Sequence, residues 1–196
     1  MARPRQITDE DILAHARAVF LEHGPHASTQ VVADRCGLSQ AALFKRFGTK
    51  RDLLVRALMP PRNPPFIALL ATGPQPGDLE PQMVDIGMAI SLFFRDQVPC
   101  MATLSASGLD AKDLMRTFDD VPPPIRLQRA VTGWLEAAGD RIDPAIDRRA
   151  LATAFLGSLH VRAFFSFIGG SGLPEDPSSY VRTVVHALLH GVGVTP

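Results

Sequence analysis

Amide, methyl and basic side chains that could contact a DNA duplex are concentrated between residues 28 and 50. A glutamine amide pairs with N6 and N7 of adenine, and an alanine is small enough to touch a thymine methyl group. Lysine and arginine contact phosphates, which sets register and affinity but not sequence preference. The residues predicted to face DNA are Gln30, Ser39, Gln40, Ala41, Ala42, Phe44, Lys45, Arg46 and Lys50.

Two short helices joined by a tight turn are needed to present these side chains together. The first has apolar residues at helical spacing, follows a serine and a threonine that can cap its start, and ends at Gly37. Ser39 can cap the second, in which Leu43 and Phe47 lie on one apolar face. This pattern predicts a helix-turn-helix whose second helix enters a major groove.

A longer pattern runs through both helices and into the next one. It consists of Ala33 to Gly37, Leu38, Ser39, Leu43, Phe44, Phe47, Lys50 and Leu53. The pattern resembles the N-terminal DNA-binding domain of the tetracycline-repressor (TetR) family of bacterial transcriptional regulators. Two positions depart from that family: Phe44 stands where a tyrosine often bonds a phosphate, and Arg51 stands where a glutamate is frequent.

Composition and charge agree with a helical protein that contacts DNA at one end. The chain has 196 residues, of which 46% are hydrophobic, enough for a substantial core. Residues 1–60 hold nine Lys or Arg against six Asp or Glu, whereas the remainder holds 11 against 14. A basic head on an acidic body is consistent with DNA contact confined to the N-terminal part.

The expected fold is all-α, with a boundary at the prolines that begin at Pro60. The resemblance implies a three-helix helix-turn-helix DNA-binding domain at residues 1–59 and a larger helical domain for ligand binding and dimerisation at residues 60–196. Apolar spacing, caps and breakers predict further helices from Thr8 to Gly24, from Lys50, and over 67–71, 81–95, 101–107, 110–118, 125–138, 144–168 and 177–192. Pro99 is expected to break or kink the chain between two of them.

The last two predicted helices have broad apolar surfaces, which a monomer with one small core has little means of covering. The resemblance implies that such helices form a four-helix interface with a two-fold mate, and a palindromic operator follows from that symmetry. The residues predicted for the homodimer interface are Phe155, Leu159, Val181, Val185, Leu188 and Leu189.

Large, adaptable side chains are frequent in the C-terminal part. Methionine and aromatic residues line cavities for small, mostly apolar molecules, although residues of these types also form ordinary cores. The residues predicted to bind an effector are Met88, Phe93, Phe94, Met101, Trp134 and Phe164.

Motifs for catalysis, cofactors and metals are lacking in the sequence. There is no Gly-rich phosphate loop after a strand and no Gly-x-Ser-x-Gly, so we expect no catalytic residues, no cofactor and no enzyme activity. His186 and His190 have the i, i+4 spacing of paired zinc ligands, but no third ligand is evident and no metal site is expected. No apolar run approaches the ~18 residues of a membrane span, which favours a cytoplasmic protein.

The sequence therefore predicts a ligand-responsive, sequence-specific DNA-binding regulator. A homodimeric repressor, released from its palindromic operator by a small apolar effector, fits these features best. Activation in place of repression stays open. The alternative is a constitutive architectural DNA-binding protein, which would need the DNA-contacting end but no effector cavity.

Overall fold

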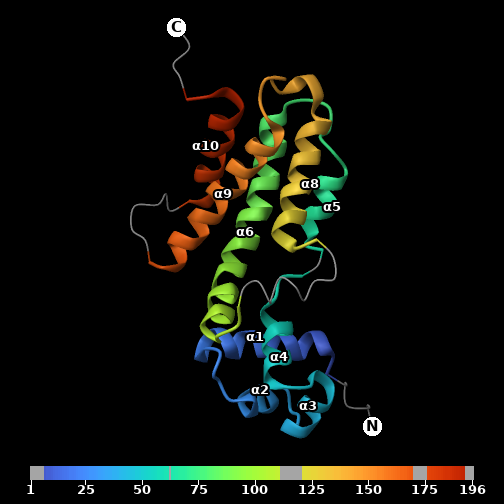
Figure 1. Ribbon diagram of the computed structural model, residues 1–196, viewed down its shortest axis with the longest axis vertical. Coiled ribbons are helices and arrows are strands. Elements are labelled where there is room, and N and C mark those ends of the chain that lie inside the picture. Colours follow the sequence, from blue (N-terminus) through green and yellow to red (C-terminus); the bar gives the residue numbers. More distant parts are fainter. Residues whose placement is uncertain (1–6, 62, 111–120, 170–175, 193–196) are drawn as a thin grey trace. The chain divides into compact units, whose positions relative to one another are not determined.

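The computed structural model describes residues 7–61, 63–110, 121–169 and 176–192, and all regular structure in these ranges is helical (Figure 1). This confirms the predicted all-α fold class. The helices are α1 (Asp9–His23), α2 (Thr29–Arg35), α3 (Gln40–Phe47), α4 (Lys50–Leu58), α5 (Pro65–Ala71), α6 (Leu79–Ala106), α8 (Pro123–Ala137), the 3-10 turn η1 (Gly139–Arg141), α9 (Arg148–Phe167) and α10 (Pro177–His190). The helix predicted at residues 110–118 lies outside the described residues.

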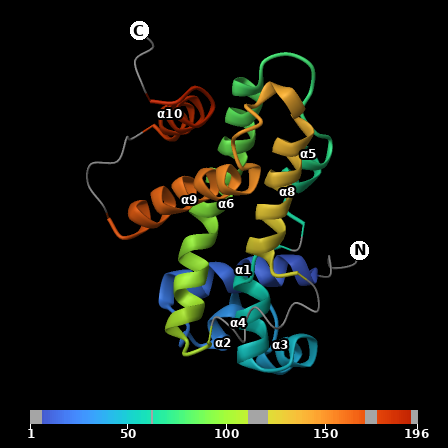
Figure 2. The same ribbon diagram turned by 45° about the horizontal axis from the view of Figure 1, so that its top comes forward.

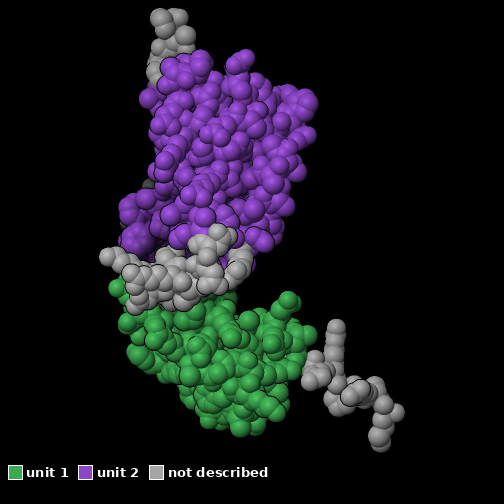
Figure 3. Space-filling model, turned by 45° about the vertical axis from the view of Figure 1, so that its right-hand side comes forward, with its two compact units in different colours: residues 1–59, 99–117 green, residues 60–98, 118–196 purple. Residues whose placement is uncertain are grey.

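The chain forms two compact units, coloured separately in Figure 3. The N-terminal unit comprises residues 1–59 together with 99–117, and the C-terminal unit comprises residues 60–98 and 118–196. The chain thus leaves the N-terminal unit after residue 59 and returns to it with residues 99–117.

Helix α1 organises the N-terminal unit. It begins with a capping box, in which the Thr8 hydroxyl accepts from the Asp11 amide at 3.1 Å and the Asp11 carboxylate accepts from the Thr8 amide at 3.3 Å. Its buried face consists of Ile12, Ala16, Val19 and Phe20. Helices α2 and α4 pack on α1, and α3 packs on α2 and α4. The α1 face thus supplies the core that holds the three shorter helices.

Of the break or kink expected at Pro99, the break is wrong, because α6 runs without interruption from Leu79 to Ala106. Proline lacks the N–H that would bond the carbonyl four residues earlier, a loss that costs about 3 kcal/mol within a helix. Cys100 and Leu104, just beyond it, are fully buried in the N-terminal core, and this burial offsets the loss. Thr103 also donates its hydroxyl to the Pro99 carbonyl at 2.9 Å.

In the C-terminal unit, α8 packs on α5 and α9, and α9 packs on α10. Both ribbon views show α5 and α8 on one side of α6 and α10 on the other (Figures 1 and 2). The Tyr180 hydroxyl donates to the Ser158 carbonyl at 3.0 Å, and the Arg162 guanidinium lies over the Tyr180 ring at 5.4 Å. These contacts fasten α10 to α9.

Gly87 allows α6 to approach α9 and α10 closely. A Cβ atom at this position would lie 2.7 Å from Cγ1 of Val181 and 3.1 Å from Cζ of Phe155, well inside van der Waals contact. Both neighbouring side chains are fully buried and therefore have little room to move. The glycine is required here by packing.

Helix α9 has more apolar surface than one core can bury. An 18-residue window of this 20-residue helix has a mean hydropathy of 1.3, which by length and composition alone would suffice to cross a membrane, and 33% of that window is buried. The sequence prediction contained no such segment. One helix of this kind is weak evidence for a membrane span, because the core helices of soluble proteins have the same composition.

We predict opposite effects from the same substitution at two helical glycines. Gly133 lies in α8 with open space around it. Gly133→Ala should therefore raise the free energy of unfolding by about 0.5–1 kcal/mol, because alanine has the higher helix propensity. Gly87→Ala gains the same propensity but should lose about 1–3 kcal/mol to overpacking. Urea unfolding followed by the fluorescence of the single tryptophan, Trp134, measures both. Equal stabilisation by the two variants would contradict the close packing at Gly87.

Candidate nucleic-acid interface

Serine side chains fix the starts of both helices in the helix-turn-helix. The Ser28 hydroxyl accepts from the Gln30 amide at 3.2 Å, and the Ser39 hydroxyl accepts from the Ala42 amide at 3.1 Å. Each satisfies a backbone donor that the helix leaves free, a contribution of roughly 1 kcal/mol. Ser39, predicted to face DNA, is thus the N-cap of α3.

The turn between the helices depends on Gly37. Its φ of +63° lies in the left-handed region, where a side chain costs about 1–2 kcal/mol. The Gly37 amide donates to the Asp34 carbonyl at 3.1 Å, and the Leu38 amide donates to the Ala33 carbonyl at 2.9 Å. These bonds close α2 and set the direction in which α3 leaves.

Both predicted base-reading glutamines have hydrogen-bond partners within the chain. The Gln40 Nε2 donates to the Thr29 hydroxyl at 2.7 Å, which links the first residues of α2 and α3. The Gln30 Nε2 donates to the Asp34 carboxylate at 2.8 Å. A side-chain amide has two N–H donors and an accepting oxygen, so one bond orients it and leaves capacity for a base.

The basic residues of α3 differ in their surroundings. Lys45 is exposed, as is Ala41 one turn earlier. The Arg46 guanidinium instead donates to the Ile7 carbonyl at 3.1 Å and lies 3.5 Å from the Asp9 carboxylate. Arg46 therefore ties α3 to the start of α1, whereas Lys45 extends from the exposed side of α3.

The start of α4 has a capping box that the sequence prediction did not include. The Thr49 amide and hydroxyl donate to the Asp52 carboxylate at 2.9 and 2.7 Å, and these bonds hold the pKa of Asp52 below its usual range. The Thr49 hydroxyl in turn accepts from the Asp52 amide. The half-buried Lys50 follows this cap, so a phosphate at this helix end would meet Lys50 beside an ionised carboxylate.

The remaining predicted DNA-facing residues, Ala42 and Phe44, are half-buried on α3. Phe44 has no hydroxyl for a phosphate, so its contact would be apolar. The structure thus brings all nine predicted residues to α2, α3 and the start of α4, and it gives Gln40 and Arg46 positioning roles that the spacing did not indicate.

The predicted interface residues lie mainly inside the C-terminal unit. Phe155, Leu159, Val181 and Val185 are fully buried in its core, and Leu188 and Leu189 are partly buried against it. The opposite side of α9 is exposed and apolar. We call this surface the α9 patch: Val161, Phe164, Phe165, Phe167 and Ile168, which are 43–57% exposed.

The predicted effector residues occupy three different places. Trp134 is buried in the C-terminal core, and Met88, Phe93 and Phe94 are partly buried against it. Met101 packs on the N-terminal core, and Phe164 belongs to the exposed α9 patch. An open groove between the start of α6 and the end of α10 contains none of them.

Comparison with known proteins finds one family model that matches part of the chain and a set of solved structures that share its fold. Residues 12–57 match the model for "Bacterial regulatory proteins, tetR family". A TetR-family regulator from Mesorhizobium loti has a TM-score of 0.71 at 16% identity, covering 95% of this chain and 96% of its own. PfmR from Thermus thermophilus has a TM-score of 0.62 at 20% identity, covering 93% and 99%. The fatty acid degradation regulator FadR from Bacillus halodurans has a TM-score of 0.63 at 15% identity, covering 98% of each chain.

No curated protein sequence matches the chain. At these identities the solved structures show a shared fold, with an N-terminal helix-turn-helix and a larger helical C-terminal part. They are regulators of transcription and not enzymes.

We predict that two neighbouring basic residues of α3 separate stability from DNA affinity. Lys45→Ala should change the free energy of unfolding by less than about 0.5 kcal/mol. It should nevertheless lower the affinity for all DNA sequences by a similar factor, and reduce the slope of log affinity against log salt concentration by about one unit per half-site. Arg46→Ala, in contrast, should lower the free energy of unfolding by about 1 kcal/mol, because it loses the hydrogen bond to the Ile7 carbonyl. Denaturation followed by circular dichroism, with DNA titrations at several salt concentrations, tests both. Equal stability of the two variants would contradict the positioning role of Arg46.

Proposed function

We propose that this TetR-family transcriptional regulator is a homodimeric, cytoplasmic repressor that a small apolar effector releases from a palindromic operator. The observation that supports operator binding most directly is the capped α2–turn–α3 geometry, which holds Gln40 by Thr29 and leaves Ala41 and Lys45 exposed on one helix. An amide, a methyl group and a cation together suit a major groove.

The α9 patch supports the homodimer. Five neighbouring apolar side chains at the end of one helix would be costly to leave in water, and such patches mark interaction surfaces. Two copies meeting through α9 and α10 about a two-fold axis would bury the patch of each chain, together with Leu188 and Leu189. The axis would place two α3 helices on half-sites about one DNA turn apart.

A footprint on promoter DNA tests the proposal. We expect protection of one discrete palindrome whose half-sites are centred ~34 Å apart or a multiple of that spacing. Gln40→Ala should relax the sequence preference at one base pair in each half-site and weaken the free energy of operator binding by roughly 1–3 kcal/mol. Uniform coating of the DNA, without a preferred site, would contradict a regulator and favour a constitutive architectural protein.

The dimer contribution is tested with a matched pair of charge substitutions. Phe165→Asp, in the α9 patch, should shift sedimentation toward the monomer and lower operator affinity. Leu69→Asp places the same charge at an equally exposed leucine on α5 and should leave the dimer intact. A Phe165→Asp protein that stays dimeric would exclude the α9 patch as the interface.

The effector site that we propose lies beside Phe93 of α6, where α6 meets α5. The Phe93 ring meets Phe66 edge-on, with centroids 5.1 Å apart, and contacts Phe94 at 5.9 Å. One turn further along α6, the buried Oε1 of Gln97 accepts no hydrogen bond from the described residues. An unsatisfied buried acceptor is costly, and a donor on the effector would satisfy it.

Helix α6 provides a lever for release, since its earlier turns belong to the C-terminal unit and its last turns to the N-terminal unit. An effector that displaced α6 beside Phe93 would also act on Cys100 and Leu104 in the N-terminal core. To induce release, it must bind the DNA-incompetent dimer more tightly than the competent one.

Trp134 gives a direct test of the effector, because it is the only tryptophan and lies in the same core. A screen of small apolar compounds with one polar donor should find some that change its emission and lower operator affinity about 5- to 150-fold. Phe93→Ala and Gln97→Ala should weaken both responses, whereas Phe164→Ala should not. A compound that changed the emission and left operator affinity intact would contradict effector-driven release.

A further inference from the structure

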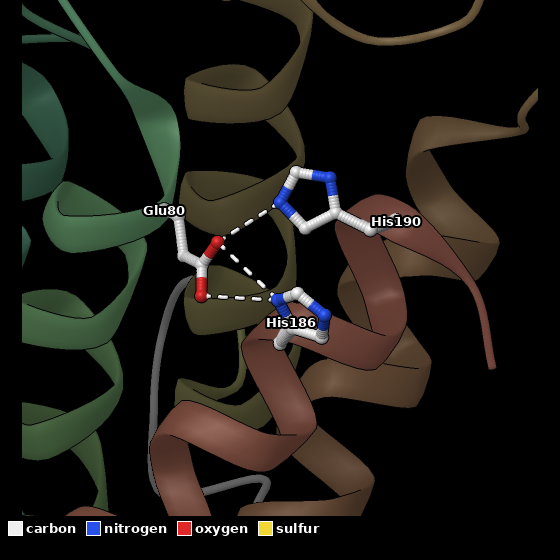
Figure 4. Close-up of side chains that lie close together, drawn as sticks. All are labelled: Glu80, His186 and His190. Carbon is white, nitrogen blue, oxygen red and sulfur yellow. Dashed lines mark hydrogen bonds and ion pairs between the residues drawn. The ribbon is translucent and has the colours of Figure 1, made fainter. Parts of the chain in front are cut away.

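Two histidines and a glutamate from different helices converge at the surface of the C-terminal unit. Glu80 lies in the first turn of α6, and His186 and His190 lie at the end of α10 (Figure 4). The three potential ligand atoms lie within 4.8 Å of one another. The sequence prediction of no metal site rested on the lack of a third ligand, and the fold supplies one from 106 residues away.

We propose that Glu80, His186 and His190 bind a divalent cation of the zinc type. His186 Nδ1 lies 3.3 and 3.5 Å from the two carboxylate oxygens of Glu80, and His190 Nε2 lies 2.9 Å from the nearer oxygen. Tetrahedral zinc with bonds of about 2.0–2.1 Å separates its ligand atoms by roughly 3.3 Å. The glutamate–histidine distances therefore already approach those of a bound cation.

The type of ligand selects the metal. Imidazole nitrogens suit zinc, nickel and copper, whereas magnesium and calcium prefer a full set of oxygen ligands. Two histidines and one carboxylate form a three-ligand zinc set, to which water adds the fourth ligand. The site lies in an open groove also lined by Thr183, Ala187 and Gly191, so water and metal can reach it.

Glu80 supplies the negative charge that a cation would meet at the site. Glu80 is the only acidic residue among those lining the groove, and its side chain is 29% exposed, against 63% for His186 and 51% for His190. Arg182, one turn before His186, also lines the groove, and its guanidinium lies 3.6 Å from the Asp176 carboxylate, which offsets its charge. A cation would replace the direct Glu–His contacts with shorter metal bonds and join the start of α6 to the end of α10.

Metal titration of the tag-free, full-length protein after removal of metal by EDTA tests the site. Isothermal titration should show one zinc ion per chain, and magnesium should show no binding. At free zinc about 100-fold above the dissociation constant, the melting temperature should rise by about 5–10 °C, because the metal binds the folded chain. Absence of zinc binding would overturn the proposal.

Three variants identify the ligands. Glu80→Gln keeps the size of the side chain but removes its charge, and it should weaken zinc binding at least ~10-fold, as should His190→Ala. His26→Ala removes an exposed histidine of the N-terminal unit and should leave zinc affinity and stoichiometry unchanged. Each variant is compared with itself in EDTA, which separates loss of metal from loss of stability. Unchanged zinc affinity in Glu80→Gln and His190→Ala would overturn the assignment.

Discussion

The surface predicted to contact DNA depends on helices that are too short to be stable alone. Helices α2, α3 and α4 have seven, eight and nine residues, whereas isolated helices shorter than about 12–15 residues are marginal in water. Two contributions hold them: side-chain caps at each N-terminus, and burial of Val32, Leu43 and Phe47 in the core that α1 organises. The direction of α3 is therefore a property of the N-terminal core, and the Arg46 bond to the Ile7 carbonyl reinforces it.

The C-terminal unit uses α9 on two sides. One side, with Phe155 and Leu159, is buried against α6 and α10, where Gly87 leaves room for close packing. The other side presents the α9 patch. A helix with apolar residues on two sides can build the core of its own chain and still offer surface to a partner. This explains how α9 can resemble a membrane span in composition while packing as a core helix.

Local chemistry made much of the fold predictable, because caps and breakers act within a few residues. Thr8, Ser28 and Ser39 cap the predicted helices, and Gly37 turns the chain as expected. Properties that depend on distant contacts were not readable. When a helix has apolar residues on more than one side, periodicity cannot tell which side is buried, so core residues of α9 and α10 were assigned to the interface. Pro99 suggested a break because the burial that offsets its cost comes from core residues far away in the sequence, among residues 1–59. Likewise, Glu80 could not be paired with His186 before the fold joined them.

The return of α6 to the N-terminal unit affects how such a protein can evolve. The core around Phe20 and Leu53 is completed by Cys100 and Leu104, which lie far along the chain from the other buried residues. A single recombination event after residue 59 would join the first helices to a foreign α6 and replace both of these side chains. A recombined chain should therefore keep its N-terminal core only when the incoming helix fills the same space. The first four helices of this chain are thus inherited together with the last turns of α6.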